Sequence, residues 1–511
     1  MSTPFFSKKY SLLSVGILSA FAATTNAAGF KLFEQSTSAM GNAYAGRGAQ
    51  ITDASIGFTN PAALSQLKQA QWVLGLNLAN VDGEFKNVSA TSAQGMPVAG
   101  PDSGSLTNVS PIPHFHYVQP INEKFTLGFS VAVPFGTSSE YNDDFVGRYF
   151  AQETQLQVLA IQPSLSYQIN DKLSIGGAIA LNYAKGTLSK YKDHSGLCEL
   201  GTGINGQYTQ LSRGTFNDVA QSAYCDSKYE VSGDDLQPSF TLGLHYQLTE
   251  STKLGISYHS AVNYTLKGDS TINNTPITGE FVQDTQNPEQ YWTAPTIPGV
   301  VDGTKLPVVD LTTGKLAVSP EKVEKSQLGL DTPQSAVISL DTQMTDRLSL
   351  QWTATWTQWS KFTDISVLSD DTQPRISPSS QQAQNLNAQG YIGYIPEHWE
   401  DAWAYALGAT YQLNNQWTVK TGIAQDNSPV NSDYRSARIP ANDRTWFTVG
   451  GHYQGNQPWS IDLAAGVMFM KDTTVIDREY NAQDEVIYNS GYQADYNINA
   501  YVVSVQFNYP L

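Results

Sequence analysis

Residues 124–135 read KFTLGFSVAVPF, and this stretch decides the fold because nearly every second side chain is large and apolar. Successive side chains of a β-strand point to opposite faces, so a period of two predicts a strand with one apolar face. The apolar set is Phe125, Leu127, Phe129, Val131, Val133 and Phe135, and the set between them is Thr126, Gly128, Ser130 and Ala132.

The same alternation recurs along the chain, with clear examples at residues 72–79, 241–248 and 459–470. The apolar sets often end in Trp, Tyr or Phe, whereas the opposite sets are rich in Gly, Ser, Thr and Asn. A soluble β-sandwich also alternates, with its apolar face turned inward. Aromatic ends fit the belts at membrane interfaces, and small polar residues suit a lumen. The pattern therefore favours a barrel whose apolar face meets lipid.

The links between the strands alternate between short turns and long polar segments. Tight periplasmic turns and long external loops are typical of bacterial outer-membrane barrels. The sequence therefore predicts an all-β transmembrane fold, a 14-stranded antiparallel outer-membrane β-barrel. The short turns are expected at residues 120–123, 170–171, 249–251, 345–346, 414–415 and 455–458. The strands are expected at 70–85, 110–119, 124–135, 154–169, 172–189, 229–248, 252–267, 324–344, 347–360, 401–413, 416–426, 443–454, 459–472 and 494–510.

The composition excludes some classes of protein. The chain has 29 Lys and Arg against 46 Asp and Glu, a net charge of −17, which makes it a poor candidate for nucleic-acid binding. An acidic soluble protein is the alternative on composition alone. Beyond the N-terminus no stretch is long and apolar enough for a membrane helix, so only a closed barrel would let the chain cross a membrane.

The N-terminus divides into two parts. Lys8 and Lys9 precede a short apolar run at residues 12–23, and Ala27 offers a small residue at a cleavage point. The run is shorter than the roughly 20 residues of a membrane anchor, so residues 1–27 are expected to be a signal peptide. Residues 28–69 then precede the barrel of residues 70–511. A segment that starts on the periplasmic side can fold up into the barrel as a plug, and a disordered tail is the alternative.

Two stretches of the chain resemble the FadL/TodX family of outer-membrane transporters for long-chain fatty acids and aromatic hydrocarbons. Residues 28–67, with an AGF start, a GNAYAG segment and the triplet Asn60-Pro61-Ala62, are similar to the family's N-terminal plug. Residues 407–469, with RIP at 438–440 and NDR at 442–444, resemble the family's last third. Val133-Pro134-Phe135-Gly136 adds weaker support.

The resemblance implies uptake of long-chain fatty acids by passive, ligand-gated diffusion through a plugged barrel, with a lateral exit beside a kinked third strand. It also implies the outer membrane of a Gram-negative bacterium, contact with lipid and lipopolysaccharide, and a monomer. Uptake of aromatic or aliphatic hydrocarbons is the alternative within the family. A general porin and a surface receptor or adhesin are alternatives of other classes. No catalytic motif stands out, so no enzymatic activity, cofactor or metal is expected.

Five residues are candidates for contact with the cargo. Phe30, Leu32 and Phe33 open the mature chain and are expected to touch ligand inside the barrel, with simple packing in the plug as the alternative. Lys185 and Lys190 lie where the fifth strand runs into its external loop. Either lysine could pair with a carboxylate, although an exposed lysine at a strand end is the more common outcome.

Other residues are expected to have structural roles. The triplet Asn60-Pro61-Ala62 is expected to brace the plug against the wall near the third strand, or else to form an ordinary turn. Arg435, Arg438 and Arg444 with Asp443 are expected to form a luminal charge network, because buried charges must be paired. A substrate anchor is the alternative for these arginines.

Three further features are the two cysteines, a pair of histidines and the last residue of the final strand. Cys198 and Cys225 fall in one external loop, and in an exported protein such a pair predicts a disulfide, two free thiols being the alternative. His114 and His116 share a face and could chelate a metal, but without a third ligand a wall-lining role is favoured. The last strand ends on Leu511 instead of an aromatic residue, which puts the efficiency of assembly in question.

Overall fold

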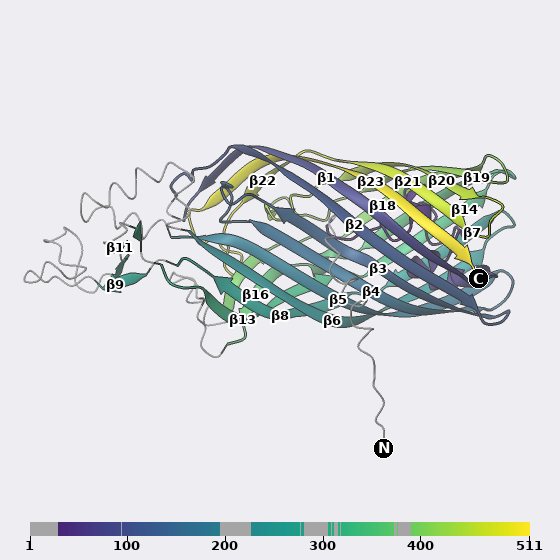
Figure 1. The fold of residues 1–511 in the computed structure, drawn as a ribbon, viewed down its shortest axis with the longest axis horizontal. Helices are drawn as coiled ribbons and strands as arrows, with labels where there is room; N and C mark the ends of the chain where they lie inside the picture. Colours follow the sequence, from purple (N-terminus) through teal and green to yellow (C-terminus); the bar gives the residue numbers. More distant parts are fainter. Residues whose placement is uncertain are drawn as a thin grey trace, which may run out of the picture.

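The computed structural model describes residues 29–93, 95–194, 226–275, 277–280, 305–307, 309–310, 315–316, 318–371, 376 and 390–511. Its long strands form one barrel (Figure 1). The first strand, β1 (Gln71–Thr91), pairs antiparallel with β2 (Ser103–Pro120) on one side and with β23 (Gly491–Pro510) on the other, so the sheet closes on itself. Closure leaves the wall without a free edge, which a lipid bilayer requires.

In the part of the chain that the structure describes, the wall is crossed fourteen times, and the predicted fourteen-stranded barrel is confirmed. Besides β1, β2 and β23, the unbroken strands are β3 (Phe125–Glu140), β4 (Glu153–Gln168), β5 (Leu173–Asp193), β6 (Asp226–Gln247), β19 (Trp417–Asp426) and β20 (Arg444–Gln454). Five crossings are broken into two strands each: β7 (Thr252–His259) with β8 (Val262–Ile272), β13 (Lys322–Thr332) with β14 (Ser335–Gln343), β15 (Leu348–Thr357) with β16 (Asp364–Ser369), β17 (Tyr391–Pro396) with β18 (Ala402–Gln412), and β21 (Ser460–Met470) with β22 (Thr473–Asp477). Four short strands between β8 and β13 form two separate small sheets: β9 (Thr278–Glu280) with β10 (Lys305–Pro307), and β11 (Val309–Asp310) with β12 (Lys315–Leu316).

The alternation places large apolar side chains on the outside of the barrel. In β20, Phe447 and Val449 are 47% and 59% exposed, whereas Trp446 and Thr448 beside them are buried. Aromatic pairs stand at the short-turn end of the wall, as in Trp72 and Tyr509, whose rings stack 5.7 Å apart. Such pairs are typical of the aromatic belt at a membrane interface.

Five of the six short turns share one local design. Asn122 Oδ1 accepts hydrogen bonds from the backbone N–H groups of Lys124 and Phe125, both at 2.9 Å. Asn and Thr favour such turns because their side chains can bond the backbone two residues later. The C-terminus lies at this end of the barrel, and the Leu511 N–H donates to the carbonyl of Ala70 at 2.8 Å (Figure 1). The equivalent turn residues are Asn170, Thr249, Thr345 and Asn414.

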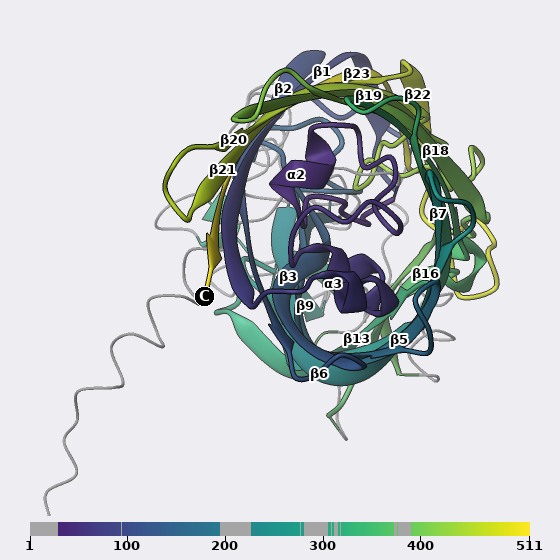
Figure 2. The ribbon, with the colours of Figure 1, turned by 90° about the vertical axis from the view of Figure 1, so that its right-hand side faces the viewer.

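Residues 29–69, here called the luminal segment, lie inside the barrel (Figure 2). The segment contains α2 (Thr37–Met40), α3 (Ile56–Thr59) and the 3-10 helix η1 (Pro61–Gln66), and most of its residues are buried. Among the described residues, no helix is long and apolar enough to cross a membrane. The segment therefore fills part of the lumen with short turns and helices that depend on the wall for their contacts.

Candidate functional site

The triplet Asn60-Pro61-Ala62 joins the luminal segment to the wall. The Asn60 Oδ1 atom accepts from the Ala62 N–H at 3.2 Å, while its Nδ2 donates to the carbonyls of Gly48 and Leu244 at 2.8 and 3.0 Å. The Ala62 carbonyl in turn accepts from the hydroxyls of Ser166 and Ser174, both at 2.8 Å. The triplet thus lies against β4, β5 and β6, and the Asn60 side chain and the Ala62 carbonyl make its bonds to the wall.

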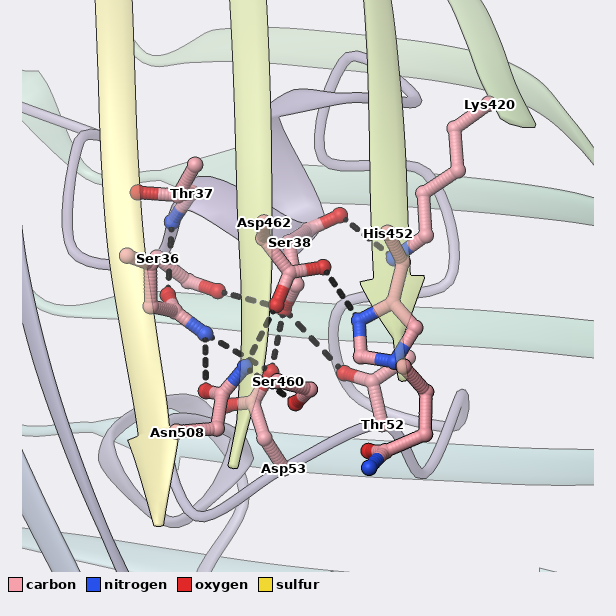
Figure 3. A network of polar contacts seen from close by, with 12 residues as sticks. Ser36, Thr37, Ser38, Thr52, Asp53, Lys420, His452, Ser460, Asp462 and Asn508 are labelled. Carbon is pink, nitrogen blue, oxygen red and sulfur yellow. Dashed lines mark hydrogen bonds and ion pairs between the residues drawn. The ribbon is translucent and has the colours of Figure 1, made fainter. Parts of the chain in front are cut away.

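A second set of polar contacts holds α2 near β19 and β23 (Figure 3). The Ser38 hydroxyl donates to Asp53 at 2.5 Å, and the Gln506 side chain donates to the same carboxylate at 3.1 Å. Lys420 Nζ donates to the Ser38 carbonyl at 2.8 Å, and Gln506 accepts from the Thr37 N–H at 3.0 Å. These buried bonds tie residues 37–53 to the wall opposite the triplet.

The third strand carries a bulge that changes its partners. The register between β3 and β4 shifts between Ala132 and Phe135. Over this stretch β3 contains one residue more than β4, which defines a β-bulge. Because the bulge reverses the alternation, Phe135 points into the lumen, where its ring lies 6.0 Å from that of Phe30. The sequence segment Val133-Pro134 therefore marks a kink in the wall.

The ladder between β2 and β3 ends at this kink. The two strands pair from Pro120↔Thr126 to Phe115↔Val131, although β2 continues to pair with β1 as far as Ser103. The half of β2 that has no ladder to β3 contains Pro111 and Pro113. Proline has no backbone N–H group to donate to a neighbouring strand. Beyond the ladder, a side-chain bond from Asn108 to Ser138, at 3.3 Å, joins the two strands.

The start of the luminal segment occupies the place of the missing partner. The Leu32 N–H donates to the Pro134 carbonyl at 2.9 Å, and the Gly136 N–H donates to the Phe30 carbonyl at 2.8 Å. The Gln35 amide donates to the carbonyl of Val133 at 3.1 Å. Residues 30–35 thus satisfy the backbone of β3 where β2 does not.

Phe30 itself lies in an aromatic cage. Its ring is 4.8 Å from Trp359, 5.2 Å from Phe362 and 5.6 Å from Trp399. Trp359 belongs to the 3-10 helix η3 (Trp359–Lys361), which interrupts the crossing of β15 and β16. The same buried apolar cluster extends to Ile376 in the link between β16 and β17 and to Ile392 on β17. A packed apolar cluster therefore connects the link between β16 and β17 to Phe30.

Three cavities surround the luminal segment, and Phe33 and Arg47 line all of them. The apolar cavity, about 430 Å³, is lined by Phe33, Ala43, Tyr44, Arg47, Thr353, Thr355, Ala404, Tyr405, Ala406, Ala424, Asp426, Trp446 and Thr448. The polar cavity, about 420 Å³, is lined by Phe33, Gln35, Ser36, Ala39, Tyr44, Arg47, Gln50, Thr52, Ser55, Ile56 and Thr59. The side cavity, about 710 Å³, lies against β3 to β8, β13 and β14, and it includes Lys31, Arg47, Phe135 and His259.

The predicted cargo residues are partly brought together. Phe30 and Leu32 are buried, and Leu32 and Phe33 line the side cavity. Lys185 is exposed, on the outward-facing side of β5, and Lys190 forms an ion pair with Glu479 at 2.9 Å. Neither lysine lines any of the three cavities, so their role as carboxylate partners stays a prediction without geometric support.

Among the described residues, the three arginines of the predicted luminal charge network form no ion pair with Asp443. Arg438 donates to the carbonyls of Glu153 and Ser189, both at 3.0 Å, and Arg435 donates to that of Ala441 at 3.1 Å. Arg444 is fully buried, and within the described ranges its three nitrogens have no hydrogen-bond partner. Backbone carbonyls are thus the main partners of Arg435 and Arg438, and Arg438 also donates to the Thr154 hydroxyl at 3.2 Å.

The other predictions concern histidines and cysteines. His114 and His116 are buried and face the lumen, bonded to Gln506 at 3.2 Å and to Ser130 and the Gln35 carbonyl at 2.9 Å. Cys198 and Cys225 lie outside the described residues, as does the expected signal peptide. The residues that the sequence did not single out are Lys31, Tyr44, Arg47, Trp359 and Trp399. Of these, Arg47 carried a signal, since it is a charged residue between two glycines inside the expected plug.

Comparison with known proteins places this geometry in context. A family model described as outer membrane protein transport protein (OMPP1/FadL/TodX) matches residues 18–511. Outer membrane protein P1 of Haemophilus influenzae is 29% identical over 483 residues, or 92% of this chain and 91% of the relative. The long-chain fatty acid transport protein of Escherichia coli O6:H1 is 27% identical over 469 residues, or 91% of each chain.

Solved structures show the same likeness. The crystal structure of a Pseudomonas aeruginosa FadL homologue is 25% identical and aligns with a TM-score of 0.73 over 94% of this chain and 99% of that chain. The Ralstonia pickettii toluene transporter TbuX is 16% identical and aligns with a TM-score of 0.56 over 93% and 98% of the two chains. The second likeness concerns the fold alone.

Proposed function

Since the chain belongs to the OMPP1/FadL/TodX family of outer membrane transport proteins, we propose that it takes up long-chain fatty acids by passive, ligand-gated diffusion through its plugged barrel. The luminal segment acts as the plug, and the cargo leaves sideways beside the kinked β3. The wall contacts outer-membrane lipid and lipopolysaccharide, and the protein works as a monomer. Relatives named for long-chain fatty acid transport support this choice of cargo.

The observation that carries the proposal is a packed apolar cluster that reaches the interrupted part of the wall. Buried apolar side chains run from Ile376 and Ile392 to Phe30. Phe30 lies beside the stretch of β3 that has no ladder to β2. A fatty-acid chain gains about 0.8 kcal/mol for each buried CH₂ group, so it favours such apolar surroundings over an aqueous pore.

The gate in this proposal is the start of the luminal segment. Residues 30–35 cover the kinked part of β3 through three hydrogen bonds, and Phe30 fills the aromatic cage. A ligand chain that enters the cage competes with the Phe30 ring for the same apolar surface. Displacement of residues 30–35 then exposes the lateral opening.

Growth of a strain that lacks its own fatty-acid importer tests the proposal. We expect a plasmid with this chain to restore growth on oleate as sole carbon source, and an empty plasmid to fail. The outer-membrane amount of the protein is measured alongside by heat-modifiable migration on gels. Absence of growth despite folded protein in the outer membrane would contradict fatty-acid uptake, and transport of labelled toluene or an alkane by the same cells would favour the hydrocarbon alternative.

A further inference from the structure

The loop that carries Arg47 is shaped by its contact with the wall. Gly46 has a left-handed backbone, with φ of +73°, and its N–H donates to the Thr353 hydroxyl at 2.8 Å. The Gly48 N–H donates to the Ser339 hydroxyl at 3.2 Å. A Cβ atom added at Gly46 would come within 2.8 Å of the Gln351 side chain. The two glycines therefore let the loop lie on β14 and β15 with only Arg47 projecting between them.

Tyr44 is held beside Arg47 by a strained backbone. Ala43 and Tyr44 both have left-handed backbones, with φ of 54° and 62°. Each such residue costs about 1–3 kcal/mol and is often found at a functional site. The ring of Tyr44 is buried, and within the described ranges its hydroxyl has no hydrogen-bond partner. Burial raises the pKa of Tyr44 well above its ordinary value, so the hydroxyl keeps its proton as a donor.

The Arg47 guanidinium keeps unused donors. It stacks over Phe33 at 4.4 Å from the ring centroid, and one terminal nitrogen donates to the Thr355 hydroxyl at 2.7 Å. Among the described residues, its Nε has no hydrogen-bond partner. Asp426 lines the same apolar cavity and attracts the guanidinium electrostatically. A guanidinium has five N–H donors, and carboxylates are the acceptors whose geometry matches it.

Arg47 and Tyr44 lie between a polar cavity and an apolar cavity. Phe33, Tyr44 and Arg47 line both the apolar and the polar cavity. The polar cavity is built entirely from residues 33–59 and offers hydroxyl and amide groups, whereas alanines and aromatic rings line the apolar cavity. Two basic residues, Lys31 and Arg47, and one acidic residue, Asp426, line the three cavities. Among these lysine, arginine, aspartate and glutamate residues, the basic ones outnumber the acidic one.

We propose that Arg47 and Tyr44 form a carboxylate-binding site in the luminal segment, with the acid head group on the polar side and its chain in the apolar cavity. The inference rests on the proposed uptake of fatty acids and names the site that recognises the head group. It also gives the plug a part in selecting the cargo, because a neutral hydrocarbon has no group that could accept a hydrogen bond from Arg47 or Tyr44.

Binding to the purified full-length protein in detergent micelles tests the site with palmitate and with 1-hexadecanol, which has the same chain without a carboxylate. We expect Arg47→Met to weaken palmitate binding roughly 10- to 100-fold, the range for loss of a hydrogen bond to a charged group. Tyr44→Phe should weaken it roughly three- to tenfold. Hexadecanol binding should change little in either variant, and Arg47→Lys should recover part of the palmitate affinity.

Arg347→Met is the matched control, because Arg347 is exposed in a short turn and lines none of the three cavities. Heat-modifiable migration shows that each variant is folded. Unchanged palmitate binding in Arg47→Met, or an equal loss for palmitate and hexadecanol, would overturn the site. If the wild-type protein binds neither ligand, the proposed function fails instead.

Discussion

Two parts of the luminal segment are held in different ways. The anchored part, residues 36–66, is fixed by buried side-chain bonds to the wall, including those of Asn60 with Leu244 and of Asp53 with Gln506. The edge part, residues 30–35, is held by three bonds to β3 and by the aromatic contacts of Phe30, and at its far end the carbonyls of Glu34 and Gln35 are bonded by Asn77 and His116. Buried polar bonds fix a unique position, whereas apolar contacts can be exchanged for those of a greasy ligand. The difference suggests a rigid frame with one replaceable edge.

The largest effect is expected from breaking the anchored part. Asn60→Ala removes the partners of the Gly48 and Leu244 carbonyls and of the Ala62 N–H. Each buried group left without a partner costs about 1–3 kcal/mol, so the segment should loosen within an intact barrel. Single-channel conductance in planar bilayers should rise well above that of the wild type. Asn414→Ala, in an exposed turn, is the control, and equal conductance in all three proteins would refute the anchoring role.

An intermediate effect is expected from the edge part. Phe30→Ala empties the aromatic cage at a local cost of about 3–5 kcal/mol but leaves the anchored bonds in place. The rate of oleate uptake should change several-fold while the heat resistance of the barrel stays the same. Phe125→Ala removes a lipid-facing ring of the same size, 40% exposed, and should leave uptake unaltered. A drop in heat resistance in Phe30→Ala without any change in uptake would make Phe30 a packing residue only.

The smallest effect is expected from Lys31, which lines the side cavity with Arg47. Burial and the nearby Arg47 lower the pKa of Lys31 to about 7, against the opposing pull of Asp426. The amine is charged below this pH and loses its proton above it, so palmitate binding should weaken modestly as the pH rises from about 6 to 8. His259 shares the cavity, so Lys31→Met is compared with the wild type at each pH. The same pH dependence in Lys31→Met would exclude Lys31.

The barrel could be predicted because its signals are local. Apolar residues recur at every second position in each strand. In most short turns an Asn or Thr side chain accepts from backbone N–H groups of the turn. The breaks within five crossings, such as that at Pro333 between β13 and β14, were not predicted because the alternation continues on both sides of them. Every second residue of the strand at residues 172–189 faces the same side. Lys185 therefore shares its side with Leu181 and Tyr183, and the alternation alone would have placed it on the outward face.

The candidate site could be predicted only in part. The resemblance of the plug identified Phe30, Leu32 and Phe33, because these residues are contiguous. The partners of Arg47 come from β15 and from Phe33, and the side chains around Phe30 come from residues 359–399. Contacts between such distant residues depend on the closure of the barrel and leave no periodic trace in the sequence.

Oleate uptake by a protein that lacks Pro134 tests most directly whether cargo leaves beside β3. Deletion of Pro134 removes the extra residue of the bulge, so β3 can stay in register with β2 beyond Val131. Pro134→Ala keeps the residue count and serves as the control. We predict that the deletion abolishes oleate uptake while the purified protein still binds palmitate, and that Pro134→Ala transports normally. Uptake by the deletion protein at the wild-type rate would contradict the lateral route.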